Sequence, residues 1–238
     1  MNSTLDSRLP TPEWAVGILT APRPTETLCR TMASLVDAGW DRAAIFAEPG
    51  SALPAVDPDY WEIIQRPEQL GAWRNWIEGL RHLVDSRPDA EFCLMVQDDV
   101  VFARNVRQYI DQSWPRGKGP TAIVSPYRPG AYKRAMKPGW QRTCQGWCLV
   151  GALCWAIPRR SAEAILRDLG NVEATHRIDA RVGQWAARAD RHVWYHAPSL
   201  AQHTGNANSA LGDTLVGDLR QAGDFVGEQA DATVFLTK

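Results

Sequence analysis

An apolar stretch that ends in two adjacent carboxylates constrains the fold of this chain most. Residues 92–96 read Phe-Cys-Leu-Met-Val, which is typical of a strand buried on both faces, and Asp98 and Asp99 follow within three residues. Burying an unpaired carboxylate is costly, so two at the tip of such a strand indicate that a cation meets them. Because α/β proteins bind ligands at the carboxyl ends of their strands, we interpret the pair as a divalent-metal site. The alternative is an Asx turn with solvated acids.

The rest of the chain predicts an α/β domain with a mostly parallel central sheet and flanking helices. Strands are predicted at residues 14–19, 43–47, 61–64, 92–96, 121–125, 149–157 and 193–196. Helices are predicted from Thr25 to Gly39, from Gly71 to Val84, at 105–113, from Ser161 to Leu169 and at 179–189. The first β-α-β unit implies parallel strands with a right-handed crossover. With no internal repeat and no linker, residues 1–238 are predicted to form one domain.

Composition favours an ordinary globular protein. The chain has 238 residues, 45% of them apolar and 22% charged, which argues against disorder. Its net charge of −1 provides no overall attraction to nucleic acid or to an anionic membrane, so any such attraction must be local. No apolar leader and no long apolar run are visible, which predicts a cytoplasmic protein without membrane contact.

A metal bound by acidic residues needs further ligands, and imidazole is a good ligand for manganese. His203 lies in a glycine-containing turn after the last predicted strand. A lone histidine in a loop is more often a solvated or capping residue. Here its neighbours matter, because it stands in the sequence Pro-Ser-Leu-Ala-Gln-His-Thr-Gly, residues 198–205, with Ser209 a few residues later.

This combination resembles the GT-A fold glycosyltransferases. The closest resemblance is to the branching N-acetylglucosaminyltransferases, whose Pro-Ser-Leu-x-Gln-His-x-Gly motif matches residues 198–205, and whose acidic pair matches Asp98 and Asp99. The resemblance implies a GT-A-like (Rossmann-like) domain. Residues 14–125 would bind the nucleotide sugar, 126–211 would bind the acceptor, and 212–238 would form a tail. Gln97 departs from the family, because many relatives carry an acid there.

The resemblance also implies a donor and a metal. Asp99 and His203 would ligate Mn²⁺ or Mg²⁺, with the diphosphate of a UDP-sugar and water completing the shell. Asp98 would bind the ribose or a metal-bound water. Other donor contacts are expected from the turn after the first strand, from the tip of the second strand, from the segment after the third strand and from the start of the second helix: Thr20, Ala21, Arg23, Glu48, Arg66, Gly71 and Asn75. Arg23 and Arg66 are candidates to bind the phosphates, because arginine makes paired contacts to phosphate oxygens, although arginine is also common on protein surfaces. For Glu48 the alternative interpretation is an exposed acid in a loop.

Displacement at the anomeric carbon with inversion requires a base that accepts the proton of the acceptor hydroxyl. Asp179 begins a predicted helix where inverting GT-A enzymes similar to this chain carry that residue, so it is the predicted catalytic base. The alternative is an acid in the first helical turn, favoured by the helix dipole. Asp168 and Glu173 are the second choices.

The segment 126–142 is basic and aromatic and contains no acid. Such a segment suits a polyanion whose bases stack, although a solvated lid is the more common structure. The chain also resembles in plan the viral and phage enzymes that glucosylate hydroxymethylpyrimidines in DNA. Hydroxymethylated DNA is therefore one expected acceptor, beside a glycan, a lipid-linked acceptor or a small molecule. The expected acceptor-binding residues are Tyr127, Arg128, Lys133, Arg134 and Trp140.

Two other functions stay open. A nucleotidyltransferase shares the parallel sheet and the acidic site but is expected to carry a glycine-rich loop with a lysine near the first strand, which Thr20-Ala21-Pro22-Arg23 does not resemble. A non-catalytic module that binds sugar or nucleic acid through the eleven tryptophans would bind without metal or turnover.

Overall fold

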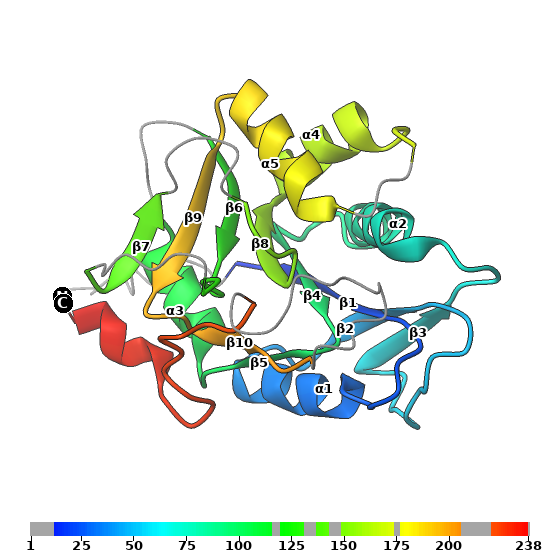
Figure 1. Ribbon diagram of the computed structural model, residues 1–238, viewed down its shortest axis with the longest axis horizontal. Helices are drawn as coiled ribbons and strands as arrows, with labels where there is room; N and C mark the ends of the chain where they lie inside the picture. Colours follow the sequence, from blue (N-terminus) through cyan, green and yellow to red (C-terminus); the bar gives the residue numbers. More distant parts are fainter. Residues whose placement is uncertain are drawn as a thin grey trace, which may run out of the picture.

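An eight-stranded mixed sheet forms the centre of the molecule (Figure 1). The computed structural model describes residues 12–115, 120–130, 137–142, 149–173, 177–205 and 220–237. The strands lie in the order β3 (Trp61–Gln65), β2 (Ala43–Ala47), β1 (Trp14–Thr20), β4 (Phe92–Gln97), β8 (Cys154–Pro158), β6 (Thr121–Ser125), β9 (His192–Ala197) and β7 (Gly139–Arg142). Strands β1 to β4 are parallel, as are β6 and β9, whereas β8 and β7 run antiparallel to their neighbours. The predicted mostly parallel sheet in a single α/β domain is confirmed.

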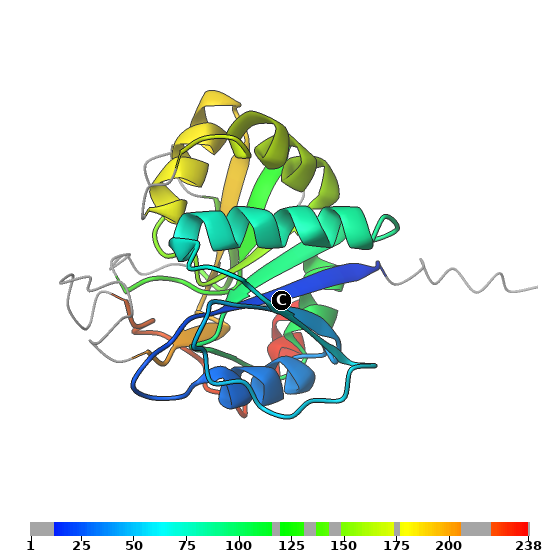
Figure 2. The ribbon, with the colours of Figure 1, turned by 90° about the vertical axis from the view of Figure 1, so that its right-hand side faces the viewer.

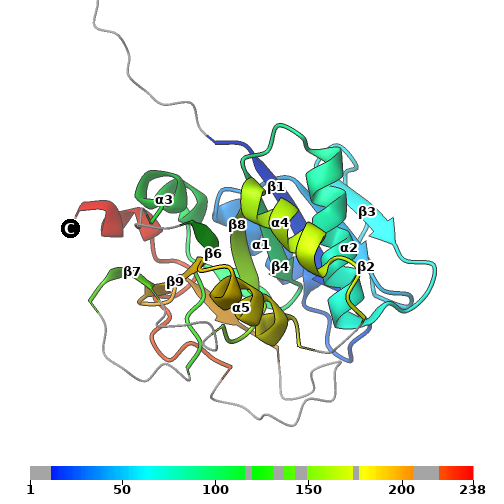
Figure 3. The ribbon, with the colours of Figure 1, turned by 90° about the horizontal axis from the view of Figure 1, so that it is seen from above.

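Helices cover both faces of this sheet (Figures 2 and 3). One face carries α2 (Gly71–Ser86), α4 (Arg159–Leu169) and α5 (Ile178–Arg188). The other carries α1 (Leu28–Asp37), α3 (Val106–Ser113), a small antiparallel sheet of β5 (Val100–Phe102) and β10 (Ala201–His203), and the C-terminal η2 (Ala232–Thr237). Among the described helices, none has both the length and the apolar character that crossing a bilayer requires.

Strand β4 shows why the sequence forms this arrangement. Cys93 and Met95 pack into the core beneath α2, whereas Leu94 and Val96 pack into the core on the α1 side. A strand with alternating side chains and apolar residues at every position must be covered on both faces. The tryptophans also contribute to the packing of the interior, because each one that the structure describes is buried or half-buried.

Two predicted element boundaries were wrong for reasons that concern the site. Helix α1 begins at Leu28, and Thr27 rather than Thr25 precedes it. The segment before it carries Arg23, which contacts the acids that follow β4. The predicted strand at 149–157 begins only at Cys154. Gly151 has a φ of +76°, which interrupts an extended chain, and residues 149–153 form a loop instead.

Other local predictions also need correction. Ser161 does not cap α4, because its hydroxyl donates to the Thr121 carbonyl at 2.7 Å and Pro158 precedes the helix. Strands β5, β7 and β10 were not predicted. Each is only three or four residues long, too short for an apolar alternation to stand out.

Candidate functional site: an acidic pair, a histidine and an arginine at the end of β4

The turn after β4 presents two buried carboxylates at the carboxyl end of the parallel strands. Asp98 is 2% exposed and Asp99 5% exposed. The hydroxyl of Thr31, on α1, fastens this turn by donating to the Asp98 carbonyl at 2.8 Å and accepting from the Val100 amide at 3.2 Å. The acids therefore stand where the sequence predicted, on a turn that the neighbouring helix holds in place.

The small sheet brings His203 to Asp99. Val100, the residue after Asp99, pairs with His203 in the antiparallel β5–β10 ladder. The Asp99 carbonyl accepts from the amide and the hydroxyl of Thr204, at 2.7 and 3.0 Å. As a result the imidazole Nε2 lies 3.1 Å from Asp99 Oδ2. The two residues predicted as metal ligands, 104 positions apart in the chain, are in contact.

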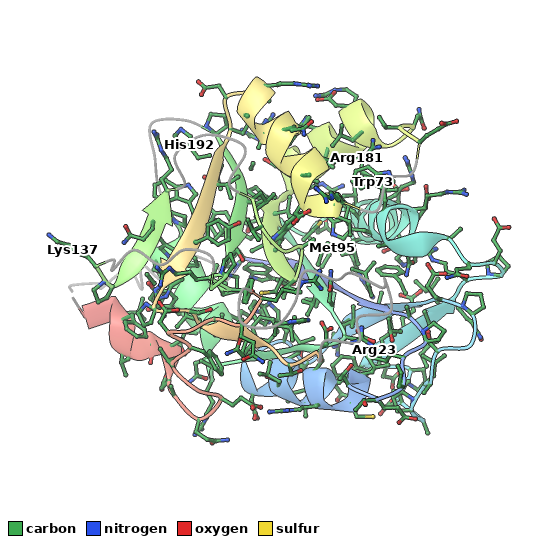
Figure 4. The ribbon with its side chains drawn as sticks, in the orientation of Figure 1. Arg23, Trp73, Met95, Lys137, Arg181 and His192 are labelled. Atoms are coloured by element: carbon green, nitrogen blue, oxygen red, sulfur yellow. The ribbon has the colours of Figure 1, made fainter. Side chains whose placement is uncertain are left out.

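Arg23 is the cation that meets both acids. It lies in the segment between β1 and α1 (Figure 4). One guanidinium nitrogen donates to Asp99 Oδ2 at 2.8 Å and the other pairs with Asp98 Oδ1. Thr20 Oγ1 donates to Asp98 Oδ2 at 2.5 Å. The turn Thr20–Arg23 thus contacts the acidic pair directly, and Ala21 lies between its two contact residues.

The two carboxylates differ in acidity. Burial raises the pKa of Asp98 to about 6, against the opposing effects of the Arg23 charge and the Thr20 hydrogen bond. Burial acts on Asp99 in the same direction. There the hydrogen bond and charge of His203, together with Arg23, outweigh burial and hold the pKa of Asp99 below its usual value. Asp99 therefore keeps its charge to lower pH than Asp98, which suits the binding of a cation.

The residues at this turn fit a divalent cation. Asp99 Oδ1 is buried and has no hydrogen-bond partner among the described residues, so one ligand oxygen is available. A Cβ at Gly205 would lie 2.4 Å from Asp99 Oδ2 and 2.7 Å from His203 Nε2. Only glycine leaves that space beside both atoms open, and the φ of Gly205 is not left-handed, so the backbone does not itself demand glycine.

The described side chains supply only part of a coordination shell. Within the ranges that the structure describes, no three His, Cys, Asp or Glu side chains converge as a metal-binding group. One carboxylate and one imidazole suit Mn²⁺ or Mg²⁺ when a phosphate-bearing ligand and water provide the remaining oxygens. The site therefore fits a metal that binds together with its ligand.

A second group of predicted donor contacts lies beside the first. Glu48 follows β2, is 4% exposed, and accepts from the Leu70 amide through Oε2 at 2.9 Å. Its Oε1 is buried without a hydrogen-bond partner among the described residues. The amide of Glu48 donates to the Thr20 carbonyl at 3.0 Å, which ties this end of β2 to the acidic turn. Glu48 is therefore a buried acceptor and not an exposed loop acid.

The start of α2 lies next to Glu48. Gly71, the first residue of the helix, has a φ of +75°, a conformation that favours glycine. Asn75 donates to the Phe46 carbonyl at 3.1 Å and accepts from Arg66 Nε at 2.9 Å. Arg66 also lies over the Phe46 ring, with 5.2 Å between the guanidinium carbon and the ring centroid. This network fixes the orientation of the Arg66 guanidinium.

Asp179 is held beside the loop that borders β4. Its Oδ2 accepts from the Gly151 amide at 2.9 Å and its Oδ1 from the Ala180 amide at 2.8 Å. The carbonyls of Ala152 and Leu153, next in this loop, accept from the side chain and the amide of Gln97, at 2.9 and 2.8 Å. Asp179 is thus linked to the residue that precedes Asp98 through this loop, whose Gly151 amide contacts Asp179 and whose Ala152 and Leu153 carbonyls contact Gln97.

The two second-choice bases lie elsewhere. Asp168, near the end of α4, accepts from Trp185 Nε1 at 2.9 Å and from the neighbouring Arg167. These contacts and the Arg167 charge lower the pKa of Asp168. Glu173 is exposed in the segment after α4.

Helices α5 and α2 are in contact through a cation and an aromatic ring. Figure 4 shows the Arg181 side chain of α5 next to the Trp73 side chain of α2, with 5.1 Å between the guanidinium carbon and the ring centroid.

The predicted acceptor residues that the structure describes do not form one group. Tyr127 is 1% exposed and donates to the Arg220 carbonyl, and the Arg128 side chain pairs with Asp224. Trp140 lies on β7, with β9, β6 and β8 between it and β4, and donates to Ser113 Oγ at 3.0 Å. Lys133 and Arg134 lie outside the described residues. Lys137, on the segment leading into β7, lies at the opposite side of the molecule from Arg23 (Figure 4).

Several residues of this site were not predicted. Thr31 gives no sequence signal, because a buried threonine on a helix resembles a core position. Gln202 and Thr204 lie inside the histidine motif, so the motif was the available signal, but their bonds depend on the β5–β10 pairing.

The architecture is that of a GT-A-like fold. The crystal structure of GalNAc-T7 with UDP, GalNAc and Mn²⁺ matches it with a TM-score of 0.53 over 82% of this chain and 44% of that chain, at 9% sequence identity. This chain thus spans less than half the length of that protein, and at such low identity the likeness concerns the fold alone. No protein-family model and no curated protein sequence matches the chain.

Proposed function

We propose that this protein is a metal-dependent glycosyltransferase that transfers a sugar from a UDP-sugar to an acceptor hydroxyl. The observation that carries the proposal is the contact of Asp99 with His203 and Arg23 at the carboxyl end of β4. Two buried acids, an imidazole and an arginine at this edge of a GT-A-like sheet suit a metal and a diphosphate together.

Asp99 and His203 are the proposed protein ligands of Mn²⁺ or Mg²⁺. When bound, such an ion stabilises negative charge on a departing diphosphate as a Lewis acid. Asp98 orients the ribose or a metal-bound water. Arg23, already beside both acids, binds phosphate oxygens.

The buried acceptor Glu48 Oε1 suits a base N–H, and uracil presents one on its edge. Gly71, Asn75 and Arg66 shape the same end of the donor site, and Ala21 lines it with backbone. The match to a structure that contains UDP and Mn²⁺ supports the choice of UDP over other nucleotides.

Asp179 is the proposed base, and an inverting outcome follows if it accepts the acceptor's proton directly. Its fixed position beside loop 149–153, which is bonded to Gln97, supports this role. A base anchored by two backbone amides keeps its orientation when a substrate arrives.

The acceptor is proposed to be a hydroxyl of a 5-hydroxymethylpyrimidine in DNA, or otherwise of a glycan or a small molecule. For DNA, the basic residues Lys133 and Arg134 provide the phosphate contacts. Replacing both by alanine is then expected to weaken duplex binding and to reduce the dependence of log K on log salt by roughly one to two units. An unchanged salt dependence would remove DNA from the acceptors.

The test of the class needs no acceptor, because transfer to water releases UDP. We expect Mn²⁺-dependent release of UDP from one member of a panel of UDP-sugars, and its loss in Asp99→Asn. Asp57→Asn is a matched control, because Asp57 is an exposed acid in the loop before β3. No release from any sugar, together with no binding of UDP, would contradict the proposal.

A further inference from the structure

Gln202 makes three hydrogen bonds beside the proposed metal ligand. Its Oε1 accepts from the amide of His203 at 3.0 Å and from the amide of Ala222 at 2.8 Å. Its Nε2 donates to the carbonyl of Ala222 at 3.1 Å. The side-chain amide of Gln202 therefore pairs with the backbone of Ala222 as a neighbouring strand would. Its Oε1 also accepts the hydrogen bond from the His203 amide.

The imidazole of His203 has no such support of its own. A metal-binding histidine usually donates its second ring nitrogen to a carboxylate or a carbonyl, which fixes the ring. Here Nδ1 is buried and has no hydrogen-bond partner among the described residues. Besides the contact of Nε2 with Asp99 Oδ2, the orientation of the ring then depends on the backbone of His203, which the β5–β10 ladder and Gln202 hold in place.

Ala222 belongs to a segment that is attached firmly to the rest of the molecule. We call residues 220–237 the C-terminal strap. Besides Gln202, the strap contacts the domain through Asp224 with Arg128 and through the amide of Val226, which donates to the Ser199 carbonyl at 3.1 Å. Further along, backbone bonds between the strap and Arg104 run in both directions, each 2.9 Å. The strap is a fixed anchor for the Gln202 side chain.

We infer that Gln202 is a positioning residue that holds His203 in place for the metal, with the C-terminal strap as its anchor. The inference rests on the proposed function, because it assigns Gln202 to the metal site proposed there. Outer partners of metal ligands commonly change metal affinity by about 10- to 100-fold when removed, and Gln202 takes that place for a histidine whose Nδ1 has no partner among the described residues.

The test measures Mn²⁺ affinity in the presence of UDP, by the electron paramagnetic resonance signal of free Mn²⁺, together with thermal unfolding of the same full-length variants. Gln202→Leu keeps the side-chain size and removes all three bonds. Gln202→Glu keeps the acceptor for His203 and loses the donor to Ala222. We expect Mn²⁺ affinity to fall in the order wild type, Gln202→Glu, Gln202→Leu, with roughly a tenfold loss for leucine.

Asp224→Ala is the matched control. It removes the ion pair of the strap with Arg128 and none of the three Gln202 bonds, so it is expected to lower the unfolding temperature while keeping Mn²⁺ affinity within about threefold of wild type. A strap that acts only on overall stability would make Mn²⁺ affinity follow the unfolding temperature in all variants, and that result would overturn the inference.

A double-mutant cycle with His203→Ala completes the test. If Gln202 acts through His203, Gln202→Leu has no further effect on residual Mn²⁺ binding once the imidazole is gone. An equal loss in both backgrounds overturns the inference and leaves the proposed function intact. Absence of Mn²⁺ binding by the wild-type protein with UDP overturns both.

Discussion

Replacing Gly205 by alanine is the most local perturbation of the proposed metal site, because it removes no ligand. The added Cβ would lie 2.4 Å from Asp99 Oδ2 and 2.7 Å from His203 Nε2, whereas real Cβ atoms essentially never approach within 3.0 Å. The carboxylate must therefore move by about 0.6 Å, three times the tolerance of about 0.2 Å on metal–ligand distances.

The expected loss of Mn²⁺ affinity is at least about 100-fold, or roughly 2.7 kcal/mol, because both protein ligands are displaced. The free energy of unfolding should change much less. Crowding a packed site costs about 1–3 kcal/mol, and the lower entropy of the unfolded chain with alanine returns about 0.4–1 kcal/mol. The assay is Mn²⁺ titration with UDP present, beside denaturant unfolding of the metal-free protein.

Gly223→Ala is the matched control. Gly223 also lacks a left-handed φ, and nothing lies within 4 Å of its hypothetical Cβ. It should bind Mn²⁺ like the wild type and be as stable or slightly more stable. Wild-type Mn²⁺ affinity in Gly205→Ala would refute the reasoning, since it would place the ion away from both Asp99 Oδ2 and His203 Nε2.

Three other perturbations separate the roles of the remaining groups. Arg23→Gln removes a charge that lowers the pKa of Asp98, so that pKa should rise above about 6. UDP titrations with Mn²⁺ at several pH values should show weaker binding, and the loss of UDP affinity on acidification should begin at a higher pH than in the wild type. Asp179→Asn should slow UDP-sugar hydrolysis by about 100-fold or more while UDP affinity stays within about twofold, and a parallel loss of UDP affinity would contradict its role as base. Burial lowers the pKa of His196 to about 4 in the folded protein, whereas the pKa of an unfolded histidine is about 6.5. The unfolded chain therefore binds this proton first, and the folded protein loses stability as pH falls from about 6.5 to about 4. Denaturant unfolding should give about 2 kcal/mol less stability at pH 5 than at pH 7, and an equal loss in His196→Gln would exclude His196 as the cause.

The sequence predicted those parts of the fold that repeat a pattern over many residues. The alternation of apolar runs and amphipathic segments in residues 14–113 was enough for strands β1 to β4 and for the helices between them, apart from the start of α1. Short strands such as β5 and β10 are set by the residues they pair with and not by their own composition, so they were missed.

The site shows the same limit. Asp98, Asp99 and His203 were predicted from a strand tip and a motif, and in the structure the last two lie in contact. Thr31 bonds to a residue 67 positions later in the chain, and Gln202 to a residue 20 positions later. A local sequence pattern cannot predict contacts over such separations. The pairing of Arg23 with both acids likewise required the three-dimensional path of the segment after β1.

The central claim is that Asp99 forms part of a site where a metal and a uridine diphosphate bind together. Calorimetric titration of UDP, with Mn²⁺ and with the metal chelated, tests it most directly for the wild type and for Asp99→Asn. We predict that UDP binds the wild type at least about tenfold more tightly with Mn²⁺ and that this gain disappears in Asp99→Asn. Equal UDP affinity with and without the metal, or the same gain in both proteins, would contradict the account.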